Sequence, residues 1–128
     1  MNREMSNSIL LALGLAFACG GARAEDERPK ADARDLAYDR GCMICHSDKA
    51  IVPSANSTLP LAPSWPEIAK RYRARADAED ILTGIVVTGS DPKQRHWSRQ
   101  AAFVAMLPND AEVTPAQART LVRWILSQ

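Results

Sequence analysis

Apolar residues recur with helical spacing in four separate stretches of the chain, at about 32–41, 65–75, 78–88 and 115–128. In each stretch, apolar side chains three and four residues apart form a stripe along one side, as in a helix that buries one face. No alternating pattern of useful length predicts a strand, and no internal repeat is present. The pattern therefore predicts an all-α domain.

Residues that favour helix starts lie at the beginning of three of these stretches. Ser64 is followed three residues later by Glu67, and Thr114 by Gln117, so both pairs can form capping boxes. Asp77 can cap the third helix through its carboxylate. These residues place the helix starts independently of the apolar stripes.

Two long irregular segments, 47–63 and 90–113, separate the predicted helices. The first contains three prolines, and neither shows a sustained period. Long segments of this kind in a compact domain are usually functional or wrapped around something. Within the third helix, Gly84 costs roughly 1 kcal/mol relative to alanine, so we expect it to pack closely against a bulky neighbour.

The first two dozen residues have the features of a secretory signal peptide. Residues 9–19 form an apolar run, and Ala22, Arg23 and Ala24 offer the small-x-small pattern that signal peptidase cuts after. The run is shorter than the roughly 20 residues that a membrane span needs, although a retained anchor stays an alternative. Lipidation at Cys19 is a second alternative. We expect export to the periplasm and no stable membrane insertion after cleavage.

Cleavage divides the chain into a signal peptide (1–24), a flexible leader (25–31) and one domain (32–128). It removes two arginines and one glutamate from totals of 16 basic and 15 acidic residues, which leaves 14 of each. This balance gives no argument for a nucleic-acid partner. The basic run at 70–75 is typical of a solvated helix face, with docking to an acidic partner as the alternative.

The segment RGCMICH places Cys42, Cys45 and His46 within five positions, just after Gly41, which can end the first helix. Two thiols at i and i+3 can reach one side of a flat ligand, while the next histidine points its imidazole at the ligand's centre. The sulfurs can add to the two vinyl groups of haem as thioethers, and the histidine can bind the iron axially. The spacing therefore indicates one covalently attached haem c.

Other uses of these residues fit less well. A structural zinc site needs four ligands, and the mature domain has no second closely spaced Cys or His pair. A redox dithiol of the thioredoxin kind belongs in a βαβ unit, whereas no strand is predicted here. Chance occurrence remains, because the motif fixes only three positions. A haem would also supply the apolar surface that so small a helical domain lacks, so the chain without haem should be largely disordered.

The motifs GCMICH, APSWPEIAKRY, AMLPN and TPAQARTLVRWILSQ follow one another as in the small monohaem class I cytochromes c of bacteria, which the mature chain resembles along essentially its whole length. The resemblance implies the class I cytochrome c fold, with four to five helices wrapped around one covalently attached haem and long connecting loops. It also implies that Tyr38 of the first helix packs against Leu121 and Trp124 of the last.

The resemblance further implies the ligands of the iron. The carbonyl of Pro63 would hold the proximal His46, and Met106 would be the sixth ligand. The family's usual Met-Pro-Pro turn is Met-Leu-Pro here, and the loop before Pro63 is longer than in the smallest members. His96 competes with Met106 for the sixth site. Its other interpretation is a histidine at the surface or at a haem propionate.

Trp65 and Trp97 are further candidates for contact with the haem, through an indole N–H to a propionate, although each can also be a plain core residue. A methionine sulfur stabilises Fe(II), and ligation on both faces leaves no vacancy for a substrate. We therefore expect no catalytic residues and no enzyme activity.

The resulting hypothesis is a periplasmic single-electron carrier that meets redox partner proteins. It would act either alone or as the electron-accepting haem subunit of an oxidoreductase such as a sulfite dehydrogenase. The alternative is a haem enzyme or gas-binding sensor with an open sixth site.

Overall fold

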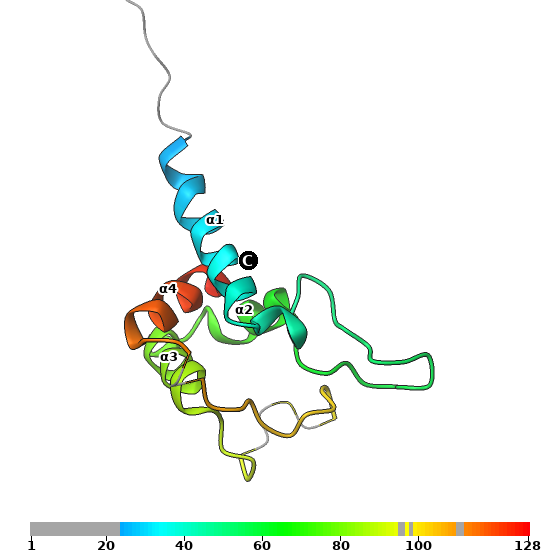
Figure 1. The fold of residues 1–128 in the computed structure, drawn as a ribbon. Coiled ribbons are helices and arrows are strands. Elements are labelled where there is room, and N and C mark those ends of the chain that lie inside the picture. The colour runs from blue at the N-terminus through cyan, green and yellow to red at the C-terminus, as the bar shows by residue number, and fades with distance from the viewer. Residues whose placement is uncertain (1–23, 95–96, 98, 110–111) are drawn as a thin grey trace, which may run out of the picture.

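The computed structural model of the protein describes residues 24–94, 97, 99–109 and 112–128. Its elements are four α-helices and one short 3-10 helix (Figure 1), namely α1 (Ala24–Asp39), η1 (Cys42–Ile44), α2 (Trp65–Tyr72), α3 (Ala78–Thr88) and α4 (Pro115–Leu126). These residues include no strand, which confirms the all-α prediction. None of the helices among them is long and apolar enough to cross a membrane. Nearly all of the predicted signal peptide lies outside the described residues, and its cleavage stays a prediction.

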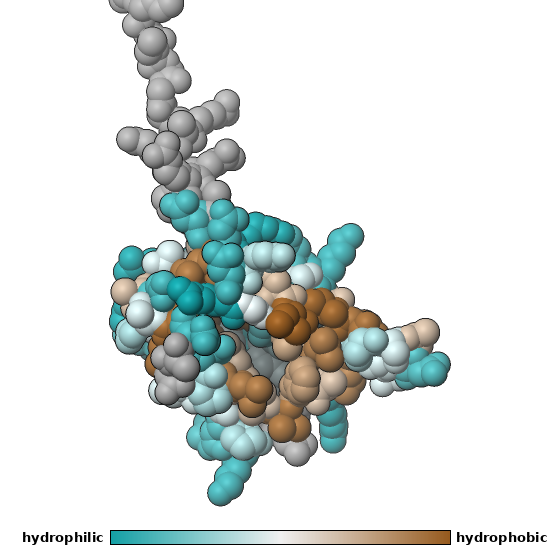
Figure 2. All heavy atoms as spheres, viewed as in Figure 1, coloured by the Kyte–Doolittle hydropathy of each residue, from teal (hydrophilic) through white to brown (hydrophobic). Residues whose placement is uncertain are grey.

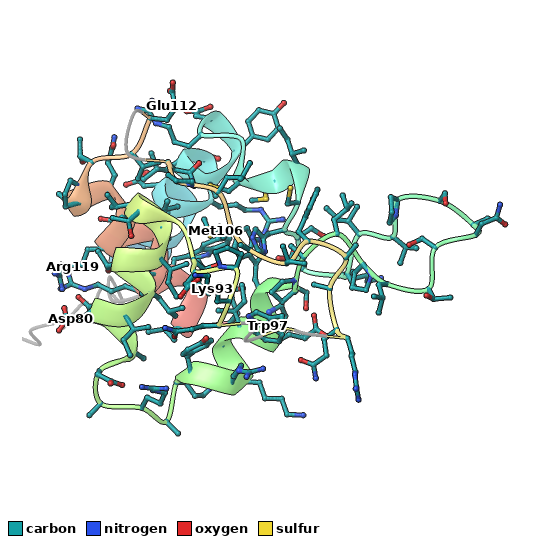
Figure 3. The ribbon with its side chains drawn as sticks, turned by 90° about the horizontal axis from the view of Figure 1, so that it is seen from below. Asp80, Lys93, Trp97, Met106, Glu112 and Arg119 are labelled. Carbon is teal, nitrogen blue, oxygen red and sulfur yellow. The ribbon has the colours of Figure 1, made fainter. Side chains whose placement is uncertain are left out.

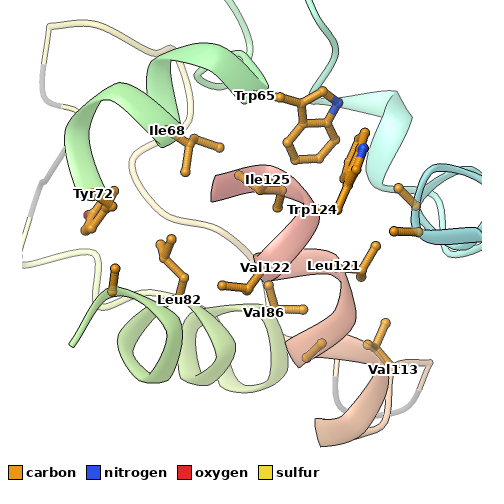
Figure 4. Packing of buried hydrophobic residues seen from close by; sticks show 14 residues of the cluster. Trp65, Ile68, Tyr72, Leu82, Val86, Val113, Leu121, Val122, Trp124 and Ile125 are labelled. Carbon is orange, nitrogen blue, oxygen red and sulfur yellow. The ribbon is translucent and has the colours of Figure 1, made fainter. Parts of the chain in front are cut away.

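Helix α4 is the centre of the packing, because it contacts α1, α2 and α3. Its apolar stripe is buried (Figure 4) and consists of Ala118, Leu121, Val122, Trp124 and Ile125. The predicted capping box opens this helix, since the Thr114 N–H donates to Gln117 Oε1 over 3.0 Å. The other predicted box opens α2, where the Ser64 N–H donates to Glu67 Oε2 over 2.7 Å. Local capping chemistry therefore fixes the first residue of both helices.

Helix α1 begins at Ala24 rather than near residue 32. It includes the residues 25–31 that we expected to form a flexible leader. The backbone continues as a helix through Pro29 despite the hydrogen bond that proline removes.

The crossing of α1 and α4 is made by small side chains. Ala33 and Ala37 are fully buried in the core cluster, whereas Tyr38 is 74% exposed. The implied packing of Tyr38 against Leu121 and Trp124 is therefore wrong. Tyr38 follows Ala37 by one residue, about 100° further round the helix, which turns it away from α4 once Ala37 faces that helix.

Helix α3 differs from expectation at two residues. Asp77 precedes it, but its carboxylate accepts hydrogen bonds from Arg75 Nε and Nη2 over 2.9 and 3.0 Å and caps no backbone N–H. Gly84 is exposed, and a Cβ added there would meet no atom within 4 Å. The expected close packing at Gly84 is wrong among the described residues.

The two long loops are joined to each other by backbone hydrogen bonds. The Ala102 N–H donates to Pro60 O over 2.7 Å, and the Phe103 N–H donates to Leu61 O over 3.1 Å. Leu61 in turn donates its own N–H to Ile51 O over 2.8 Å, across the first loop. Both loops lie on the same side of the helices (Figure 1). They therefore form one connected rim beside the helical core.

Candidate haem-binding site

The CxxCH segment follows directly from the end of α1. Gly41 has φ 71°, a left-handed conformation that glycine adopts without cost, and it turns the chain into η1. The Cys45 and His46 N–H groups both donate to Cys42 O, over 3.3 and 3.0 Å. Both thiols are free and partly buried, and burial raises the pKa of the Cys42 thiol. The two sulfurs are thus carried by one compact turn and stay available for covalent attachment.

His46 is oriented by a backbone carbonyl. Its Nδ1 lies 2.7 Å from Pro63 O, and because a carbonyl oxygen only accepts, Nδ1 carries the proton. Burial lowers the pKa of His46, although the hydrogen bond to Pro63 opposes that shift. The neutral imidazole therefore has its lone pair on Nε2, the atom that can bind a metal. The expected position of Pro63 beside His46 is met in the structure.

Trp65 covers one face of this imidazole. The two rings are stacked with centroids 4.8 Å apart and an interplanar angle of 23°. Trp124 meets Trp65 edge-on at 5.3 Å (Figure 4). Trp65 is only 3% exposed, and its Nε1 has no hydrogen-bond partner among the described residues. A buried indole N–H without a partner is costly, so an acceptor that is not part of the described chain suits this position.

Met106 lies in a segment that is fastened to the end of α3. The Ser90 N–H donates to Met106 O and the Met106 N–H donates to Ser90 Oγ, each over 2.9 Å. Asn109 donates its N–H to Val87 O over 3.0 Å. Gly89 allows the close approach, because a Cβ there would lie 2.7 Å from Met106 O. The segment is thus held at Met106 itself and three residues later, at Asn109.

Sequence reasoning missed the residues that hold this segment, namely Gly89, Ser90 and Asn109. Gly89 also ends α3, where its N–H donates to Ile85 O. The hydrogen bonds join positions 16 or more residues apart, so no periodic pattern marks them. The only sequence signal was the adjacency of Met106 to a proline-containing turn.

The core cluster brings several predicted site residues together. Cys42, Trp97 and Met106 are partly buried and pack against it, while Trp65 belongs to it. Figure 3, a view from below, shows Met106 and Trp97 on the segment nearest the viewer, between α3 and the first loop. The Arg71 guanidinium lies over the Trp97 ring, 4.7 Å from its centroid. His96 lies outside the described residues, so its predicted role stays untested.

Apolar side chains surround this region without covering it. Figure 2 shows them gathered over the two long loops, around a recess. The exposed large apolar residues among the described ones are Tyr38, Ile44, Val52, Phe103, Val104 and Leu107, most of which lie in or beside these loops. An apolar recess, two free thiols, a neutral histidine and an unpartnered indole N–H together fit a haem, which is largely apolar and bears carboxylates.

Comparisons with known proteins point the same way. Cytochrome c-552 of Hydrogenobacter thermophilus is 36% identical over 92 residues, which span 72% of this chain and 76% of that protein. Cytochrome c-551 of Pseudomonas aeruginosa is 33% identical over 119 residues, or 93% of this chain and 91% of that protein. Cytochrome c2 of Rhodocyclus tenuis is 32% identical over 97 residues, covering 76% and 92%.

Among solved structures, cytochrome c552 of Nitrosomonas europaea matches with a TM-score of 0.55 and 27% identity, over 73% of this chain and 96% of that one. No family model matches the chain.

Proposed function

Since the chain belongs to the small monohaem class I cytochromes c, whose members carry one covalent haem c, we propose that it is a periplasmic single-electron carrier. The observation that carries this proposal is the geometry of His46, whose Nδ1–H is committed to Pro63 O while Nε2 stays available. When bound, the haem iron supplies the redox chemistry by cycling between Fe(III) and Fe(II).

The chain's own residues would hold the haem in three ways. The Cys42 and Cys45 thiols would add to the two vinyl groups, and the S–H protons would end on the vinyl carbons. His46 would bind the iron from one side through Nε2. Trp65 and Trp97 would offer their indole N–H groups to propionates, which would satisfy the unpartnered Nε1 of Trp65.

Met106 would occupy the sixth site. Its segment is tied to Ser90 by two hydrogen bonds and to α3 through Asn109, so the sulfur would be presented by a held backbone rather than a free loop. Methionine ligation stabilises Fe(II), and ligation on both faces leaves no position for a substrate. The two ligands together favour electron transfer over catalysis.

The periplasmic location and the form in which the protein works are finer parts of the proposal. The apolar run and the Ala22–Ala24 cleavage pattern support export. The carrier would act either alone or as the electron-accepting haem subunit of a periplasmic oxidoreductase such as a sulfite dehydrogenase. Purification from the native periplasm distinguishes the two, because a subunit would bring its catalytic partner with it.

Replacement of Met106 tests the proposed sixth ligand. In Met106→Ala the haem should stay attached, while the reduction potential falls and added imidazole or cyanide binds the iron. The weak red-edge charge-transfer band of iron–methionine sulfur should disappear from the ferric absorption spectrum. Met43→Ala is the matched control, because it removes a thioether sulfur that lies between the attachment cysteines.

An unchanged spectrum and potential in Met106→Ala would contradict the assignment. His96→Ala would then decide whether a second histidine binds the iron. A wild-type protein that binds cyanide without displacing any ligand would favour the alternative, a haem enzyme or gas sensor with an open sixth site.

A further inference from the structure

Two chain segments are clamped together around His46. The Nδ1–H of His46 donates to Pro63 O over 2.7 Å, and the Trp65 N–H donates to Ser47 O over 3.0 Å. The two hydrogen bonds run in opposite directions between residues 46–47 and 63–65. This pairing sets the Trp65 backbone at a fixed place beside the imidazole.

The hydrogen bond to Pro63 alone does not fix the plane of the imidazole. The χ2 torsion of histidine is a broad, roughly two-fold torsion. A hydrogen bond also tolerates tens of degrees of misalignment before it weakens steeply. The ring can therefore rotate over a considerable arc while Nδ1 stays within reach of Pro63 O. A second contact is needed to select one plane.

Trp65 provides that second contact. Its indole lies against the imidazole face with centroids 4.8 Å apart and planes only 23° from parallel. The indole is itself immobilised, since Trp124 abuts it edge-on and the residue opens the capped helix α2. Because the residue is only 3% exposed and its indole contacts Trp124, the indole cannot turn freely together with the imidazole.

We propose that Trp65 is a positioning residue for His46. By stacking on the imidazole, Trp65 would fix the plane in which that ring stands when its Nε2 binds the haem iron. The proposal rests on the proposed function, in which His46 binds the iron. Trp65 acts through the imidazole ring, independently of any hydrogen bond that its Nε1 makes.

The plane of an axial imidazole has a measurable consequence. In the ferric protein with haem bound, the orientation of the His46 ring, together with that of the Met106 sulfur, would decide how unpaired spin spreads over the haem methyl groups. Because Met106 is unchanged in the variants compared, a change in the order or spread of the methyl proton resonances would report a change in the ring plane. These resonances respond little to a mutation that changes only stability.

Three variants separate stacking from other roles of Trp65. Trp65→Phe keeps a flat ring against the imidazole and loses the N–H, and Trp65→Leu keeps an apolar side chain without a flat face. We expect Trp65→Leu to change the order or the spread of the ferric haem methyl resonances, and Trp65→Phe to keep both. Tyr72→Leu, at the other end of α2 and equally buried, is the control for lost aromatic packing (Figure 4). A wild-type pattern in Trp65→Leu, or the same change in Tyr72→Leu, would overturn the proposal.

A measurement on the unaltered protein covers the case in which Trp65→Leu does not fold. In the reduced, diamagnetic protein, nuclear Overhauser cross-peaks should join the Trp65 indole protons to the His46 ring protons. The His46 ring protons should also show the strong upfield shift of a group on the haem axis. If that shift is absent, the axial role of His46 fails. If it is present without the cross-peaks, only the positioning role of Trp65 is overturned.

Discussion

Gly84, within α3, and Gly89, at its C-terminal end, differ in how strongly the structure requires glycine. Gly89 has φ 77° and ψ 178°, a region that is essentially restricted to glycine. A Cβ at Gly89 would also lie 2.7 Å from Met106 O and 2.9 Å from Pro108 N. Gly84 lies in mid-helix, and nothing approaches within 4 Å of its added Cβ. One position is needed for the Met106 segment, and the other is not.

Gly89→Ala should loosen the attachment of Met106. Backbone strain of about 1–3 kcal/mol and the contact with Met106 O would displace the segment that presents the sulfur. We expect faster binding of added imidazole to the ferric iron and a lower unfolding midpoint. Gly84→Ala is the matched control and should raise the free energy of unfolding by up to about 1 kcal/mol. Equal imidazole binding in both variants would show that Gly89 does not hold the Met106 segment.

The sequence was informative for residues whose roles are local and uninformative for those whose roles depend on distant partners. The spacing of Cys42, Cys45 and His46 is by itself enough to indicate haem attachment. The His46–Pro63 geometry was expected only through the family resemblance. The stacking of Trp65 on His46 was not foreseen, because a tryptophan in an apolar stripe is equally suited to core packing. Trp65 meets His46 because residues 63–65 pair with residues 46–47, and no local pattern predicts that pairing.

At the scale of elements, α3 and α4 are joined by an ion-pair cluster at the surface. Glu79 Oε1 accepts from Arg119 Nη1 over 3.1 Å and from Arg123 Nε over 3.0 Å. Asp80 Oδ1 accepts from the same Arg119 nitrogen over 3.0 Å. The hydrogen bonds from Arg123 and Arg119 hold the pKa of Glu79 below its usual value of 4.5. The ionised carboxylate therefore favours the docked arrangement of the two helices.

The Glu79 cluster should make stability depend on pH in the acid range. Because the folded pKa lies below the unfolded one, the unfolded state binds more protons, and the free energy of unfolding rises as pH rises through this range. The contribution is complete above about pH 4.5, the usual value of Glu79, and is lost as pH falls through the folded pKa. In urea unfolding, the stabilities of wild type and Glu79→Gln should differ at pH 7 and converge as pH falls through the folded pKa of Glu79.

Glu112→Gln controls for the loss of one negative charge, since Glu112 forms one weak ion pair among the described residues, with Arg40 at 3.8 Å. A Glu79→Gln difference that persists unchanged at low pH would contradict the ionic explanation. The ionic explanation would also be contradicted if the unfolding free energies of Glu112→Gln and wild type converged to the same extent as pH falls.

The helices themselves were largely predictable, whereas their contacts were not. The capping boxes at Ser64 and Thr114 gave the correct starts of α2 and α4, because they are reciprocal hydrogen bonds over three residues. The contact of Tyr38 with α4, which the family resemblance implied, was wrong because Ala33 and Ala37 are the buried residues of α1 and leave Tyr38 exposed.

At the scale of the whole molecule, the apolar core is thin. Many of its buried hydrophobic residues are alanines, namely Ala33, Ala37, Ala62, Ala69, Ala78, Ala101 and Ala118. The larger buried side chains, among them Trp65, Leu121 and Trp124, lie mainly along α2, α3 and α4. Other large apolar side chains are exposed in or beside the loops around the recess. Alanine burial contributes little transfer free energy, so the chain alone has a small hydrophobic driving force.

The two long loops, 47–63 and 90–113, are also expected to need the haem for their stability. Their backbones are joined to each other by the Pro60–Ala102 and Leu61–Phe103 hydrogen bonds. No sequence pattern predicted that residues 60–61 would meet 102–103, because such pairings between loops follow from what the loops enclose. A ligand that both loops contact would supply what the protein contacts lack.

A chain that cannot attach haem should therefore lose most of its structure. We expect the double variant Cys42→Ala, Cys45→Ala, purified without haem, to show a weak far-ultraviolet helical signal and no cooperative thermal transition. The ordering entropy of about 1–2 kcal/mol per residue is not offset by so thin a core. Adding free haem to the double variant should restore part of the helical signal, because the apolar surface of the macrocycle is then available without the thioether bonds. A helical signal and a cooperative transition equal to those of the wild type, in the absence of haem, would show that the alanine-rich core is sufficient by itself.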